Sequence, residues 1–368
     1  MNNEAGKADL ATELATAEFV ASPKRTMVTH NSALQKVQLN DRSLGKPYYE
    51  TSETDLRYYL TRLLEDIIDN TRSQTFKLDD NGFIKKLLEE LIGSDFNSAA
   101  VKFTERLLNC EIEKQDQLGG FTKLRDGSLL CCHFTVNGEE HIVLVKVDHA
   151  DFLNEATLMR SAGLPEKQRA QKCATFKVIG DQLDPIVVIS DSSPLLTEYW
   201  WNAFLCLTPL SSPETNTLKS FLALESLLKN RIQPKSKTDY WTLRNSLVGY
   251  YTTREQCSFP DMIDELFSGY KPDSLDVSME KLIAEAKELP KKGKGFDTLF
   301  SIAPKIIKAR IKRQINLAEN VDLRITGEIN DFTGMFNTGE DAGRKYLKIY
   351  SDQGYEAFHR KASENEIE

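Results

Sequence analysis

The sequence has no apolar run that approaches the roughly 18 residues that a membrane span needs. Its longest apolar stretches, Ile142–Val145 and Pro185–Ile189, have the size of single strands. The N-terminus, MNNEAGKADLATEL, also lacks the basic and then apolar pattern of a secretory leader. We therefore expect a cytoplasmic protein that makes no contact with a membrane.

The sequence also has no excess of positive charge. The 368 residues include 47 Lys and Arg against 55 Asp and Glu, so the formal net charge is −8. A field of this sign repels nucleic acid, which excludes a basic DNA coat and restricts any DNA contact to a local patch. The length predicts two or three folding units with a substantial core.

Signatures of metal and redox sites are scarce. The six cysteines form no CxxC pair, and scattered cysteines in a cytosolic chain are usually small buried apolar residues. Three of the five histidines fall within His133–His149, but no spacing resembles a structural zinc module. We therefore expect no metal and no cofactor.

Catalytic signatures are also absent. The chain contains no GxSxG, no P-loop, no GxGxxG after a strand and no HExxH, which favours a non-enzymatic protein. One alternative is a metal-dependent nuclease, whose carboxylates and lysine lie around a sheet; the candidates are Asp126, Glu140, Lys146 and Asp148. The residue two before the lysine, Leu144, is not acidic. The simpler interpretation is that Lys146 and Asp148 mark the exposed end of a strand.

Periodicity in the first half predicts helices followed by a sheet. Apolar residues recur at steps of three and four in 56–70, 83–93 and 98–112, as in amphipathic helices. The turn dipeptides Asp126-Gly127 and Asn137-Gly138 then separate three runs rich in β-formers. These runs are Phe121–Leu124, Ser128–Val136 and His141–Val147. The third, HIVLVKV, is apolar on both faces, so we expect a central strand.

The rest of the chain alternates in type. Strands are expected near Thr175–Ile179 and Ile186–Ser190, and helices in 214–230, 240–255, 259–270 and 278–289. The stretches KIIKARIKRQINL, VDLRITGEI and RKYLKIYS are interpreted as strands. The fold class is α+β, with N-terminal helices on a largely antiparallel sheet, then a helical segment and a small C-terminal β-rich subdomain. The expected ranges are a mobile tail 1–25, a core domain 26–230, a helical segment with a basic loop 231–300, a β-rich subdomain 301–358 and an acidic tail 359–368.

An aromatic cluster precedes the second half. Residues 197–207, TEYWWNAFLCL, offer rings of the kind on which bases stack, but helical spacing favours core packing.

The charge is unevenly distributed along the chain. Residues 281–316 contain ten basic and three acidic residues, a net +7, so the other residues sum to −15. On a strand, Lys308, Arg310 and Lys312 would share one face and follow a phosphate backbone. The alternative is an ordinary solvated face. The candidate DNA-contacting residues are Lys291, Lys292, Lys294, Lys305, Lys308, Arg310, Lys312 and Arg313.

The chain resembles the bacterial 37-kDa nucleoid-associated protein family over about residues 26–358. The stretches that carry this resemblance are FKLDDNGFIKKLLEELIGSDFNSAAVKFTERLLNC, LGGFTKLRDGSLLCCHFTVNGEEHIVLVKVDHADFLNEATL, TFKVIGDQLDPIVVIS, TEYWWNAFLCLTPL and RKYLKIYSDQGYEAF. The resemblance implies a cytoplasmic, nucleoid-located protein that binds double-stranded DNA, contacts DNA-topology or chromosome-associated proteins, and forms a homodimer.

The leading hypothesis is a non-enzymatic protein that contacts the DNA phosphate backbone with little sequence preference, since no base-reading motif is evident. Two alternatives stay open. One is the metal-dependent nuclease. The other is a protein-interaction subunit of a bacterial defence complex, such as phage defence, or of a chromosome-maintenance complex, which would bind through the helices of 240–290.

Overall fold

The fold is described from a computed structural model of the 368-residue chain. The described residues are 25–49, 54–119, 123–153, 155, 158–167, 170–193, 196–293, 295–310, 313–325 and 332–359. Nearly all of the expected tails, 1–25 and 359–368, lies outside these ranges.

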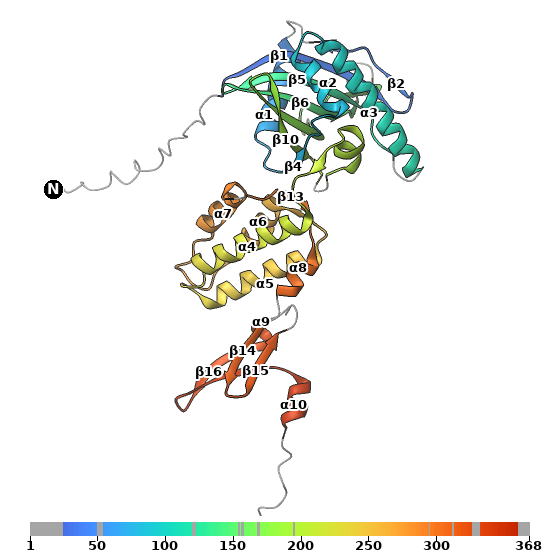
Figure 1. The fold of residues 1–368 in the computed structure, drawn as a ribbon. Coiled ribbons are helices and arrows are strands. Elements are labelled where there is room, and N and C mark those ends of the chain that lie inside the picture. The colour runs from blue at the N-terminus through green and yellow to red at the C-terminus, as the bar shows by residue number, and fades with distance from the viewer. Residues whose placement is uncertain are drawn as a thin grey trace, which may run out of the picture.

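A nine-stranded antiparallel sheet forms the first unit (Figure 1). Its strand order is β11-β4-β10-β9-β6-β5-β1-β2, and β3 pairs with β1. The strands are β1 Met27–Gln38, β2 Ser43–Leu44, β3 Tyr48–Tyr49, β4 Gln74–Lys77, β5 Gly127–Val136, β6 Glu139–Asp148, β9 Lys172–Ile179, β10 Gln182–Asp191 and β11 Thr208–Pro209. The predicted α+β class is confirmed, and β6 is central as expected, because it lies between β5 and β9.

The β5–β6 hairpin shows how the sequence sets the register. Asn137 and Gly138 both adopt positive φ, 50° and 85°, as a two-residue type I′ turn requires. Val136 then pairs with Glu139, and the ladder continues to Gly127 opposite Asp148. The first of the three predicted β-runs, Phe121–Leu124, is wrong for the two residues that the structure describes. Lys123 and Leu124 lie in no strand.

Helices cover both faces of this sheet. The helices of this unit are α1 Thr54–Ile68, α2 Phe83–Ile92 and α3 Phe96–Leu118. Ile142 and Leu144 of β6 belong to one buried cluster with α2 and α3, whereas Val143 and Val145 belong to another with α1. Alternate side chains of a strand point to opposite faces. The two-sided apolar pattern of β6 therefore follows from its place between two helical layers.

The aromatic stretch packs as predicted for a core element. It forms a short π-helix, η1, at Tyr199–Phe204, in which Trp200 and Phe204 are buried against the α3 side of the sheet. Trp201 is only partly buried and lies beside Phe76 of β4, with ring centroids 5.2 Å apart.

A second unit has its own core, to which Leu224, Leu243, Tyr251, Phe267 and Ile307 contribute. Its elements are α4 Pro213–Arg231, α5 Lys237–Thr253, β12 Gln256–Ser258, α6 Phe259–Phe267, α7 Met279–Lys287, η2 Leu289–Lys291, β13 Leu299–Ser301 and α8 Pro304–Arg310. Because the buried side of α4 faces α5, this helix packs with the second unit. The expected core domain, 26–230, had instead included this helix.

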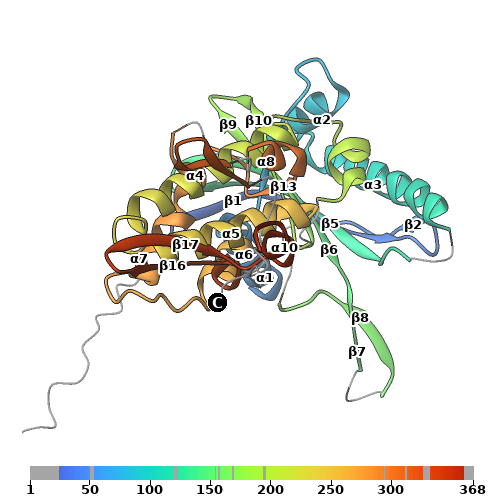
Figure 2. The ribbon, with the colours of Figure 1, turned by 90° about the horizontal axis from the view of Figure 1, so that it is seen from below.

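Three further hairpins complete the described chain. The hairpin of β7 Ala150–Leu153 and β8 Arg160–Gly163 projects from the sheet unit (Figure 2). The C-terminal elements are β14 Arg313–Ala318, β15 Val321–Ile325, α9 Phe332–Met335, β16 Phe336–Asp341, β17 Arg344–Ile349 and α10 Asp352–Phe358. The expected strands of this subdomain are confirmed from 313 onward. Residues 305–310, which we predicted to be extended, are helical.

A network of hydrogen bonds joins the sheet unit to the helical unit. The Ser73 carbonyl oxygen, just before β4, accepts from the backbone N–H groups of Thr298 and Leu299, both at 3.0 Å. The backbone N–H and the hydroxyl of Thr75 donate to one carboxylate oxygen of Asp297 at 2.9 and 2.7 Å, and Asn216 of α4 donates to the other oxygen at 2.8 Å. Asp297 is buried and receives donors from both units.

We predict that Asp297→Ala loosens this junction. A buried donor left without an acceptor costs about 1–3 kcal/mol, and this change removes the acceptor of Thr75 and of Asn216. The expected result is a lower free energy of unfolding in urea and faster proteolytic cleavage between the units. Asp276→Ala, at an exposed position of the helical unit, is the control. Equal stability of the two variants would contradict the prediction.

Candidate nucleic-acid interface

The eight predicted DNA-contacting residues fall into three groups. Lys294 and Lys312 lie outside the described residues, and for Arg310 and Arg313 only the backbone is described, at the end of α8 and the start of β14. The side chains of Lys291, Lys292, Lys305 and Lys308 are described, and all four are exposed.

Helix α8 presents two of these lysines. Proline is favoured as the first residue of a helix because its φ is already helical, and α8 starts at Pro304. Ile307 is fully buried in the core of the second unit, which anchors the helix. Lys305 and Lys308 are one turn apart and lie on the same side. The predicted strand face of Lys308, Arg310 and Lys312 is therefore wrong, because a helix spreads residues two apart around its surface.

The other two described lysines lie at η2. The Lys291 ammonium is 3.3 Å from a carboxylate oxygen of Glu288, and both side chains are exposed. Such a surface pair contributes only about 0–1 kcal/mol, so a phosphate can replace the carboxylate at little cost. Among the described residues, Lys292, Lys305 and Lys308 form no ion pair. Both η2 and α8 pack against α4.

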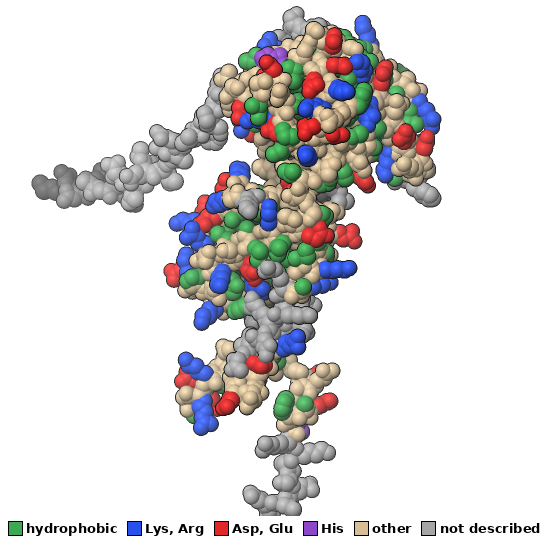
Figure 3. Space-filling view, viewed as in Figure 1, with side chains coloured by type: hydrophobic (Ala, Val, Ile, Leu, Met, Phe, Trp, Pro, Cys, Tyr) green, Lys and Arg blue, Asp and Glu red, His purple; other side chains and the backbone are tan. Residues whose placement is uncertain are grey.

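Several other cations of the helical unit are paired with carboxylates. Lys287 pairs with Asp264 at 2.9 Å and Arg231 with Glu285 at 2.9 Å. Figure 3 shows blue and red side chains interspersed over this unit on the face in view. The basic segment offers local groups of ammonium charges on two elements, which suits phosphate oxygens.

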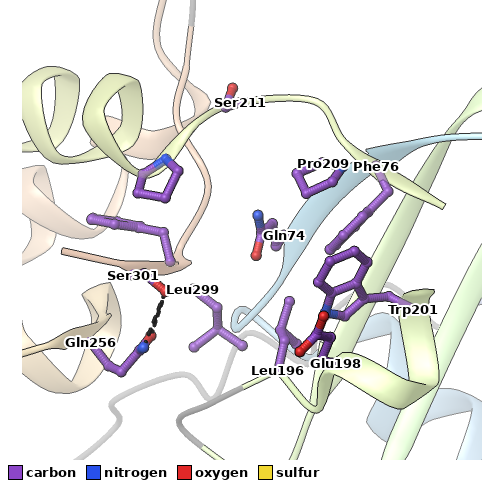
Figure 4. A pocket seen from close by; sticks show the side chains of 12 residues that line it. Gln74, Phe76, Leu196, Glu198, Trp201, Pro209, Ser211, Gln256, Leu299 and Ser301 are labelled. Atoms are coloured by element: carbon purple, nitrogen blue, oxygen red, sulfur yellow. Dashed lines mark hydrogen bonds between the residues drawn. The ribbon is translucent and has the colours of Figure 1, made fainter. Parts of the chain in front are cut away.

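A cleft at the junction of the two units has a different character. It has a volume of about 290 Å³ and is bordered by Phe76, Trp201 and Leu299 (Figure 4). Gln256 donates to the Ser301 hydroxyl at its rim, at 3.1 Å. Its described lining contains one charged side chain, Glu198, and no Lys or Arg. An anionic backbone would find no counterion there.

The nuclease candidates are only partly brought together. Glu140 lies near the β5–β6 turn, where it pairs with His133 at 2.5 Å. Lys146 and Asp148 lie at the opposite end of the hairpin, 3.4 Å apart. The Asp126 carboxylate accepts from the backbone N–H of Leu39 at 2.9 Å.

The partner of Lys146 is a residue that sequence reasoning missed. The Glu111 carboxylate of α3 lies 2.5 Å from the Lys146 ammonium, and the side chains are 0% and 4% exposed. The Tyr199 hydroxyl donates to the same carboxylate at 2.9 Å. Lys146 is thus buried, which corrects the expected exposed strand end, because α3 crosses the sheet there. Glu111 follows Phe103 and Leu107 at steps of four along the buried side of α3. This spacing could have predicted from the sequence that Glu111 is buried.

The electrostatics of this pair favour a structural role. Burial alone would lower the pKa of Lys146, but the charges of Glu111 and Asp148 and their hydrogen bonds raise it above its ordinary value. The lysine therefore stays charged, and its stabilising effect is lost only when the pH rises through the raised pKa. A phosphodiester cannot reach either charge in this packing. Within the described part of the chain, no three His, Cys, Asp or Glu side chains are placed to hold a metal ion.

The comparison with protein families decides the class of the chain. The model of the family described as NA37, nucleoid-associated protein YejK, matches residues 38–337. The chain belongs to this family. The resemblance inferred from the sequence is thereby confirmed, and the match extends over both units and into β16. None of the curated proteins compared with the chain matches it. No helix among the described residues has the length and apolarity to cross a bilayer.

We predict that Lys146→Met destabilises the sheet unit by about 3–5 kcal/mol, because it leaves the Glu111 charge buried without a partner. The measurement is the free energy of unfolding in urea. The double variant Glu111→Leu with Lys146→Met should recover part of the destabilisation, since neither charge of the pair remains but the buried Tyr199 hydroxyl loses its acceptor.

The exposed pair Lys177 and Glu139, also 2.5 Å apart, gives a matched control. Lys177→Met should change the free energy of unfolding far less than Lys146→Met does, because solvent already screens the exposed pair. Similar destabilisation by the two Lys→Met variants would show that burial of the Lys146 pair is not what matters.

Proposed function

We propose that the chain is a nucleoid-located, non-enzymatic protein that binds double-stranded DNA through its phosphate backbone with little sequence preference. Membership of the nucleoid-associated family supports the DNA partner. The observation that carries the site is the pair Lys305 and Lys308 on one side of α8, exposed and without an ion pair among the described residues. Lys291 at the end of η2 and Lys292 directly after it extend the proposed surface, as do Lys294, Arg310, Lys312 and Arg313 by their positions in the sequence.

The negative net charge of the chain restricts where a duplex can make contact. The residues outside 281–316 carry a net −15, so the rest of the molecule repels a duplex. Contact is then confined to a few lysines, and each lysine releases condensed counterions when it neutralises a phosphate. Binding is oriented and of modest affinity, and it weakens steeply with salt.

We also propose that the protein forms a homodimer, in keeping with the expectation from the sequence. The β7–β8 hairpin supports this, because it exposes Phe152, Leu153, Leu158 and Met159. An isolated two-stranded hairpin is marginally stable in water. A second copy related by a two-fold axis covers the same apolar surface on both subunits. Proteins of the DNA-topology and chromosome-associated classes are proposed as further partners.

The DNA-binding proposal predicts that Lys305→Gln with Lys308→Gln weakens binding to a duplex of arbitrary sequence. The plot of log affinity against log salt should become shallower by about 0.9 for each phosphate that the variant no longer neutralises. Fluorescence anisotropy with the full chain over a salt series measures both quantities.

The control is Lys86→Gln with Lys123→Gln, which removes the same charge from exposed positions of the sheet unit. It should leave the slope close to that of the native chain. No duplex binding at low salt, or equal effects of the two double variants, would refute the proposed surface.

The dimer proposal predicts that Leu153→Ser with Met159→Ser shifts the protein toward the monomer. Removing two exposed apolar side chains lowers the apolar area that association can bury. Light scattering after size-exclusion chromatography gives the mass over a concentration series. The exposed Leu275 lies in the helical unit, so Leu275→Ser should leave the mass unchanged. A native chain that stays monomeric at every concentration would refute the dimer.

A further inference from the structure

The β16–β17 hairpin carries a basic and aromatic face that the proposed duplex surface does not use. Alternate side chains of a strand share a face, so Arg344, Tyr346 and Lys348 point to one side of β17 and Tyr350 continues their row. The opposite face has Lys345, Leu347 and Ile349. The family match ends at residue 337, so β17 lies beyond it.

Tyr346 forms a flat platform on this face. It pairs with Gly339 of β16, and a Cβ atom at that position would collide with the tyrosine ring. Because glycine has no side chain, the ring lies directly over the backbone of the neighbouring strand. The residue is still 49% exposed, so part of the ring is open to solvent.

The cations of the same face are available to a ligand. The Lys348 ammonium lies 4.6 Å from the centre of the Tyr350 ring, which is itself 53% exposed. Lys348 lies opposite the neutral Asn337, and the acidic residue of this face, Asp341, lies opposite Arg344 near the turn. Within the described ranges, Arg344 and Lys348 form no ion pair. In Figure 3, Lys and Arg side chains lie beside Asp and Glu side chains at the lower left, near the place where Figure 1 labels β16.

We propose that this face binds single-stranded nucleic acid, with bases stacked on Tyr346 and Tyr350 and phosphates at Arg344 and Lys348. Single-strand sites combine aromatic rings, on which any base stacks, with cations that follow the backbone. Residues two apart on a strand are separated by about 6.8 Å, so rings and cations alternate along an extended path. A duplex keeps its bases stacked internally and offers the rings nothing. The site is therefore distinct from the α8 and η2 surface.

The test uses the full chain and a fluorescent oligothymidylate at low salt, with anisotropy as the readout. Tyr346→Ala with Tyr350→Ala should weaken binding by about tenfold or more, because the bases no longer stack on either ring. Tyr346→Phe with Tyr350→Phe should bind like the native chain, since the rings remain. Arg344→Gln with Lys348→Gln should make the salt dependence shallower by about 0.7 for each phosphate left without its cation.

Lys345→Gln is the matched control, because it removes one charge from the opposite face of the same strand. It should leave oligothymidylate binding unchanged. The Tyr→Ala variant should also retain the native affinity for duplex DNA, which reports on the α8 and η2 surface alone. Failure of one proposal is thus distinguishable from failure of the other.

Several results would overturn the inference. The first is a native chain that does not bind oligothymidylate at low salt, and the second is a Tyr→Ala variant that binds it normally. Equal weakening of oligothymidylate and duplex binding in the Tyr→Ala variant would assign the face to duplex contact or to folding of the hairpin. An effect of Lys345→Gln as large as that of Arg344→Gln with Lys348→Gln would show a nonspecific influence of charge.

Discussion

The Asp297 carboxylate determines how the parts of this protein are held together. A buried carboxylate must be hydrogen-bonded, and here the donors come from Thr75 of the sheet unit and Asn216 of the helical unit. The same chain segment is fixed a few residues later, where the Ala303 N–H donates to the Thr217 hydroxyl at 3.0 Å. The lysines of η2 and α8 flank these two anchors in the sequence, so the junction that joins the units also positions the proposed DNA surface.

The acidic residues of the basic segment explain its availability to a ligand. Residues 281–316 contain three of them, Glu285, Glu288 and Asp297. Glu285 pairs with Arg231 on α4, and Asp297 is buried in the junction. Glu288 alone pairs with a basic residue of the same segment, Lys291. Two of the three acids are thus engaged by groups outside the segment, and among its described lysines Lys292, Lys305 and Lys308 form no ion pair.

Much of the fold was predictable from local pattern, whereas the sites were not. The alternation of β6 and the Asn137-Gly138 turn act over a few residues, so the sequence alone predicts strand and register. Helix α8 was missed because I-K-A-R-I-K, residues 307–312, alternates apolar and basic residues as a strand does. Pro304 was the signal that favours the helix. Lys146 was placed at an exposed end because its partner, Glu111, is distant in the sequence. Only the packing of α3 across the sheet brings the two charges together.

The C-terminal subdomain follows a different physical logic from the two units before it. Between Phe336 and His359, none of the side chains is buried, so the burial of apolar surface does little to hold β16–β17. Folding free energy for such hairpins must come from elsewhere. A ligand that binds only the folded hairpin supplies it by mass action. An exposed row of rings and cations on β17 fits that requirement, because a bound partner would cover residues such as Tyr346 and Tyr350 that are otherwise about half exposed.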